Sequence, residues 1–175
     1  MDVRVVIALV TALVGTAPAQ AGNVESLRQQ VDSSVRDCRA SETLRVPLRS
    51  SGLDLVPVYG NGYESDTAEG SPFAEQDLAI QLWRENDLAA QLEAYLRCES
   101  PVMRLTQAQA QLAAAITGDD QRTEMVAFYQ HGWSSGADSV VARDRIDGLA
   151  DLSGARIAIQ AHGAQLDLLA STLEA

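Results

Sequence analysis

The sequence predicts an α/β domain with a mostly parallel sheet flanked by helices, and two observations support this fold class. Short apolar runs of strand length alternate with longer segments whose apolar residues recur every three or four positions. The segments between them are rich in Gly, Ser, Asn and Asp, which favour turns. Strands that alternate with helices at such intervals are typical of a parallel sheet covered by helices.

Residues 1–21 have the pattern of a secretory signal peptide. Arg4 gives a weak charged start, residues 5–14 are almost wholly apolar, and small residues at Ala19 and Ala21 suit cleavage after Ala21. The alternative is a membrane anchor, but the apolar run is shorter than the ~20 residues that a spanning helix needs. We therefore expect export to the periplasm.

The first elements after this leader are a helix and two strands. Apolar residues over 24–38 recur at helical spacing, with Asn23 as the expected cap, so residues 22–43 form an N-terminal helical extension. The main domain, residues 44–175, begins with a strand over 44–49. A loop over 59–71, a helical turn capped by Ser71 and a second strand over 78–83 follow.

The pattern of the remaining sequence predicts two helices, three further strands and a last helix. One helix begins after Asn86 or Asp87 and is broken by Ser100 and Pro101. The next begins at Thr106, where the segment 106–109 (T-Q-A-Q) is a capping box. Apolar runs over 125–129, 140–142 and 156–160 then predict strands, and the last helix starts near residue 163.

The charge balance limits the classes of partner. The chain has 24 acidic and 13 basic residues and a formal net charge of −11, which argues against nucleic acid or an anionic membrane as a partner. No basic residue lies between Arg49 and Arg84. We interpret that acidic stretch as a solvated face, because it lacks the regular oxygen-ligand spacing of a calcium loop.

The two cysteines allow one disulfide, but the sequence does not decide whether it forms. In an oxidising compartment Cys38 and Cys98 could pair and close a long loop, although the sequence does not show whether their geometry permits it. His131 and His162 have no zinc-type spacing with them. We therefore expect neither a metal nor a cofactor.

One motif suggests catalysis. The segment 132–136 (G-W-S-S-G) matches the nucleophile-elbow pattern of α/β-hydrolases, and Asp151 and His162 follow Ser134 in the order of a triad. The pattern requires a strand before it and a helix after it. The run over 125–129 predicts that strand, but residues 138–142 also resemble a strand. We therefore expect no enzyme, and keep a small serine hydrolase as an alternative.

The same region supports a non-catalytic binding site. Helix N-termini bind small anions through free N–H groups and the helix dipole, and ligands of open α/β sheets lie outside the carboxyl ends of the strands. The turn after the first strand, the helix cap at Thr106 and the turn before the last helix would meet there. Each residue of these turns could also be an ordinary cap or turn residue without a ligand. The candidate ligand-binding residues are Ser50, Ser51, Thr106, Trp133, Ser134, Ser135, His162 and Gly163.

Several motifs resemble one family in the same order. The segment 146–158 (I-x-x-L-x-D-L-x-G-x-R-I-A) is similar to a signature of type 2 periplasmic substrate-binding proteins. The segment 160–169 (Q-A-H-G-A-x-x-D-x-L) resembles its continuation in the nitrate/sulfonate/taurine group of ABC-transporter binding proteins. The segments 70–78, 91–96, 100–106 and 133–138 are similar to that group as well, so the resemblance covers residues 45–175.

The resemblance implies a monomeric solute-binding component of an ABC-type importer, which captures a small solute and delivers it to a permease in the inner membrane. An anion is one candidate solute. The turn at Ser50 and Ser51 departs from the more usual aromatic, Gly-rich turn of this group, which leaves the ligand class open. The match covers the first lobe only, so we expect the second lobe to be absent. A fragment, a truncated reading frame and a periplasmic sensor or interaction module that binds a protein through residues 24–35 remain alternatives.

Overall fold

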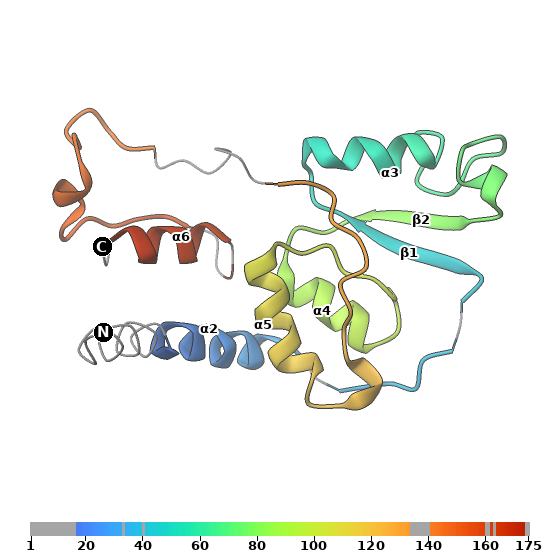
Figure 1. The fold of residues 1–175 in the computed structure, drawn as a ribbon, viewed down its shortest axis with the longest axis horizontal. Coiled ribbons are helices and arrows are strands. Elements are labelled where there is room, and N and C mark those ends of the chain that lie inside the picture. Colours follow the sequence, from blue (N-terminus) through green and yellow to red (C-terminus); the bar gives the residue numbers. More distant parts are fainter. Residues whose placement is uncertain are drawn as a thin grey trace, which may run out of the picture.

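The computed structural model describes residues 17–32, 34–39, 41–133, 141–159, 162 and 164–173. It is a mixed α/β structure with a small parallel two-stranded sheet (Figure 1). Helix α3 (Leu55–Gly60) lies on one side of the sheet, and helices α4 (Leu88–Leu96) and α5 (Gln107–Thr117) lie on the other (Figure 1). The predicted class is therefore confirmed at this coarse level, but the described residues form a smaller sheet than predicted.

The sheet consists of β1 (Thr43–Leu48) and β2 (Ala79–Arg84), with Val46 opposite Leu82. Both strands lie within one residue of their predicted bounds. Pro47 lies inside β1, where it has no N–H to donate. It is tolerated because β1 has a neighbour on one side only within the described sheet.

The outer edge of β2 is covered by the loop that follows α3. The Thr67 N–H donates to the Ile80 carbonyl over 3.1 Å, and the Leu82 N–H donates to the Ser65 carbonyl over 2.7 Å. The buried side-chain amide of Asn61 donates to three carbonyls, including that of Ile80 at 3.3 Å. Satisfying these backbone groups fixes the loop against the strand.

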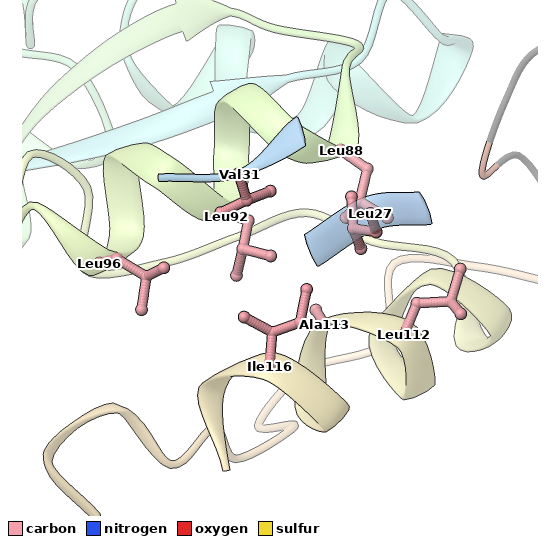
Figure 2. Close-up of a cluster of buried hydrophobic side chains, with 8 residues drawn as sticks. All are labelled: Leu27, Val31, Leu88, Leu92, Leu96, Leu112, Ala113 and Ile116. Carbon is pink, nitrogen blue, oxygen red and sulfur yellow. The ribbon is translucent and has the colours of Figure 1, made fainter. Parts of the chain in front are cut away.

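The hydrophobic core lies between α4, α5 and helix α2 (Ala17–Gln30). Figure 2 shows side chains from all three helices meeting there. Leu27 of α2, Leu92 of α4 and Ala113 of α5 are completely buried. The core cluster comprises Leu27, Val31, Leu88, Leu92, Leu96, Leu112, Ala113 and Ile116.

Helix α2 differs from the predicted extension in two ways. It already includes Ala17, so Asn23 lies inside the helix and does not cap it. Its apolar face also completes the core. Arg28 strengthens this packing by donating to the Ala115 carbonyl over 2.6 Å and pairing with Asp119 near the C-terminus of α5, where a cation is favoured.

The caps of α4 and α5 follow the sequence prediction. The Asp87 carboxylate accepts the Ala90 N–H over 2.9 Å at the start of α4. At the start of α5, the Thr106 hydroxyl accepts the Gln109 N–H over 3.3 Å, and the Gln109 side chain accepts the Thr106 N–H over 3.2 Å. The predicted capping box is confirmed.

Cys38 and Cys98 form a disulfide, with their Cα atoms 5.2 Å apart. It joins the segment after α2 to the end of α4, where the Arg36 N–H also donates to the Leu96 carbonyl over 3.1 Å. The bridge spans a sequence separation of 60 residues. In the chain-entropy account, a loop of this size stabilises the fold by ~4 kcal/mol.

The strands predicted over 125–129, 140–142 and 156–160 are not found among the described residues. Residues 124–133 and 153–159 contain no helix or strand, and residues 140 and 160 lie outside the described part. Phe128, for example, is 79% exposed. A strand needs a hydrogen-bonded neighbour. Apolar composition alone predicted strands here, but within the described residues no strand pairs with these runs.

Shorter elements complete the structure. Helix α3 was not predicted, because Pro57 and Gly60 make its sequence resemble a loop; proline is tolerated there in the first helical turn. The Ser71 hydroxyl accepts the Ala74 N–H over 3.3 Å before the 3₁₀ turn Ala74–Gln76. The other 3₁₀ turns are Gly52–Asp54, Gln121–Thr123 and Leu149–Leu152, and the last helix is α6 (Ala164–Leu173), as predicted.

Candidate functional site

The candidate site lies at the carboxyl end of β1. The chain turns sharply there, because Ser50 has a left-handed backbone with φ of 54°. The buried carboxylate of Asp54 holds this turn by accepting the N–H groups of Arg49 over 3.1 Å and Ser51 over 2.9 Å. One carboxylate oxygen, Oδ2, is thereby committed to the backbone.

The other oxygen of Asp54 pairs with the guanidinium of Arg104. The two side chains are only 11% and 12% exposed, so water screens this pair weakly. Arg104 also donates to the Ser51 hydroxyl over 3.2 Å, and its backbone N–H donates to the side chain of Gln91 over 2.9 Å. Arg104 therefore connects the turn after β1 to α4.

A second guanidinium, from Arg49, lies beside the first. It donates to the Gln109 side chain, to the Arg104 carbonyl over 3.3 Å and to the Asn86 carbonyl over 3.5 Å. Burial lowers the pKa of Arg49. Burial also lowers the pKa of Arg104, and the nearby charge of Arg49 lowers it further. Among the described residues, Asp54 is the only carboxylate in contact with either arginine.

Helix α5 begins at the same place. Gln109, in the first turn of α5, accepts from Arg49 and donates to the His162 carbonyl over 3.1 Å. The site therefore includes the N-terminal, positive end of an 11-residue helix, capped by Thr106. His162 is buried with a φ of 55°, immediately before α6.

The segment around residue 131 also approaches the site. Burial lowers the pKa of His131, and the positive charge of Arg104 lowers it further. A methyl group added at Gly132 would lie 3.2 Å from the Leu53 side chain, in the turn after β1. The ring of Tyr129 packs edge-on against His131 at a centroid distance of 4.9 Å. This segment therefore lies against Leu53 in the turn after β1.

The structure brings some of the predicted site residues together and leaves others apart. Ser51, Thr106 and His162 all join the arginine network, and Ser50 accepts from the Asn86 side chain over 3.4 Å. Trp133 is 84% exposed and does not form a wall of the site. Ser134, Ser135 and Gly163 lie outside the described residues.

Sequence reasoning missed the charged members of this site. Arg49 directly follows β1, and Asp54 comes five residues later, but both resemble ordinary loop residues in the sequence. The usable signal was a basic residue placed immediately after a strand, where parallel sheets bind ligands. Arg104 was noted only as part of a motif, because its partner Asp54 is 50 positions away in the chain.

The structure supplies little of the context that the hydrolase alternative needs. Residues 124–133, which precede the G-W-S-S-G segment, form no strand. The Asp151 carboxylate accepts the N–H groups of Asp147 over 3.0 Å and Gly148 over 3.1 Å. It therefore caps its own exposed 3₁₀ turn. Ser134 itself lies outside the described residues.

The described part of the chain contains no group of three or more His, Cys, Asp or Glu side chains that could hold a metal ion. Within the same residues, no helix is both long and apolar enough to cross a membrane.

Comparisons with known proteins identify no relative. No protein-family model, no curated protein and no solved structure matches this chain.

Proposed function

We propose that this chain is the solute-binding component of an ABC-type importer and that it captures a small anion at the carboxyl end of β1. The observation that carries this proposal is an unbalanced pair of arginines: the guanidinium groups of Arg49 and Arg104 are partly buried near each other, and the only carboxylate ion-paired with either of them among the described residues is Asp54, which pairs with Arg104. The cluster therefore keeps one unit of positive charge in a chain whose net charge is −11. A second anion would relieve that imbalance.

The chemistry of the surrounding groups favours an oxyanion. Guanidinium groups bind oxyanions such as carboxylates, nitrate and sulfonates by donating paired hydrogen bonds to two oxygens of the anion. The Ser51 hydroxyl and the N-terminus of α5 add a neutral donor and a dipole of the right sign. The proposed activity is therefore reversible binding of such an oxyanion.

The proposed compartment and partner follow from the same function. Residues 1–21 have the pattern of a leader for export to the periplasm, and the Cys38–Cys98 disulfide is typical of an oxidising compartment. We propose that the chain works there as a monomer and delivers its solute to a permease in the inner membrane. The order of motifs over residues 45–175 supports this assignment.

Thermal unfolding with candidate anions tests the proposal. Nitrate, taurine and methanesulfonate are added separately at matched ionic strength. We expect at least one of them to raise the Tm of the wild-type chain progressively with its concentration. Arg104→Gln should abolish this rise. Because that change leaves Asp54 buried without its cation, it also lowers the Tm itself, so the comparison is between ligand-induced shifts.

Two matched variants complete the experiment. Arg156→Gln removes the same charge from an exposed position and should leave the shift intact. Ser51→Ala keeps the ion pair and should only weaken the response. The proposal would be wrong if folded wild-type protein gave no shift with any of the anions, or if Arg104→Gln and Arg156→Gln responded alike.

A further inference from the structure

Helix α3 lies on the side of the sheet opposite α4 and α5 (Figure 1). It carries a ridge of exposed apolar side chains. Leu55, Val56, Tyr59 and Tyr63 are 58 to 71% exposed. The first three share one helix face, and Tyr63 packs edge-on against Tyr59 at a centroid distance of 5.9 Å. Contiguous exposed apolar side chains of this kind mark interaction surfaces.

The stretch that contains this ridge carries charge of one sign only. Residues 50–83 hold six of the 24 acidic residues of the chain and none of the 13 basic ones. One of the six, Asp54, is buried and paired with Arg104. The other five are exposed and form no salt bridge within the described part of the chain: Glu64, Asp66, Glu69, Glu75 and Asp77.

The loop that carries several of these carboxylates is held in place. Asn61 is completely buried, and its side chain accepts the Thr67 hydroxyl over 2.7 Å while donating to the carbonyls of Glu64 and Ser65. Phe73 packs its ring against Gly60 at the end of α3, where a Cβ would lie 2.4 Å from the ring. A surface that is ordered before binding loses less entropy when a partner docks.

The negative charge of this surface favours a positively charged binding partner. A second copy of the chain would place carboxylates against carboxylates, and a nucleic acid or an anionic membrane would be repelled in the same way. A protein segment with an apolar face bordered by Lys or Arg satisfies both the ridge and the carboxylates. We propose that the α3 ridge and the five exposed carboxylates form a docking surface for a basic, amphipathic segment of a partner protein. This surface shares no residue with the cluster of Arg49, Asp54 and Arg104.

Peptide binding to the full chain tests this proposal. The probe is a helical peptide of about four turns, built from Leu and Lys so that the leucines share one face; a scrambled peptide of the same composition is the control. Calorimetry should show the amphipathic peptide binding at least about tenfold more tightly than the scrambled one, because only it presents an apolar face to the ridge.

Matched variants distinguish binding at this surface from attraction by the net charge of the chain. Glu64→Gln, Glu69→Gln and Glu75→Gln together should weaken binding about tenfold. Glu124→Gln, Asp144→Asn and Asp147→Asn change the net charge equally at exposed positions elsewhere and should alter binding less than about twofold. Val56→Ser with Tyr59→Ser should also weaken binding, whereas Val126→Ser with Phe128→Ser, at two more exposed positions, should not.

Three outcomes would overturn the proposal. Equal binding of both peptides, or equal losses in the two charge-matched sets, would indicate attraction by net charge alone. Sedimentation that shows a dimer of the wild type, lost in Val56→Ser with Tyr59→Ser, would identify a second copy as the occupant. Unchanged circular dichroism and Tm in each variant confirm that the losses do not come from unfolding.

Discussion

Two regions of this chain are similarly apolar but behave differently. In α4 (Leu88–Leu96), Leu88, Leu92 and Leu96 are buried between α2 and α5. In residues 125–129, Val126 and Phe128 are almost fully exposed, and the segment has no regular structure. The comparison shows that apolar side chains are buried only where a second element presents a complementary face. Helix α4 has two such partners, whereas in residues 125–129 only Met125 packs against the core, and the side chains of Val126 and Phe128 remain exposed.

The largest expected difference between the two regions is in the cost of truncation. Leu92→Ala should lower the free energy of unfolding by about 2–5 kcal/mol, because it opens a cavity at a completely buried site. Phe128→Ala removes a larger side chain but should change it by less than about 0.5 kcal/mol, since that ring is exposed. Urea denaturation of both variants measures the difference. Similar losses would show that residues 125–129 pack on the fold.

The next largest effect is expected from removing the Cys38–Cys98 disulfide, which joins the segment after α2 to the end of α4. Replacing Cys38 and Cys98 together by Ser should lower the free energy of unfolding by about 2–5 kcal/mol. Because the disulfide fixes the segment after α2 to the end of α4, amide protons in α2 and α4 should exchange faster. Those of residues 125–133 should be unaffected. Faster exchange confined to residues 125–133 would contradict this division of the chain.

The smallest effect lies at the border between the two regions. Arg122 pairs with Asp120 over 2.6 Å, and these bonds lower the pKa of Asp120 to about 2. A carboxylate whose pKa is lowered by folding stabilises the folded state at pH values above its ordinary pKa, near 4. This stabilisation is lost as the pH falls toward 2. Arg122→Gln should return this pKa toward 4 in an NMR titration. An unchanged pKa would mean that the pair does not persist in solution.

Local chemistry made part of the fold predictable. The capping box at Thr106 and the cap at Asp87 depend on residues within one helical turn, so their sequence patterns sufficed. The strands β1 and β2 were recognisable from their short apolar runs. Helix α3 was missed because Pro57 resembles a loop residue unless its place in a first turn is known.

The candidate site was predictable only in part. Ser51 and Thr106 were identified because each lies at a turn or a cap, which the sequence marks. The charges beside them come from residues far apart: Arg49 contacts Gln109, and Asp54 pairs with Arg104. No local pattern joins these pairs, because their contact depends on the parallel crossover from β1 to β2 and on the path through α4.

The sequence by itself determined the acidic balance, the caps, the two strands and the helical periods, since each depends on composition or on neighbours a few residues apart. Only the tertiary structure decided which apolar faces found partners. Helix α2 became part of the core because α4 and α5 present matching faces, whereas the runs at 125–129 and 156–159 meet no strand among the described residues. It also placed the Arg49 and Arg104 guanidinium groups near each other with one carboxylate, Asp54, paired to Arg104, because long-range packing, and not sequence proximity, sets the distance between charges.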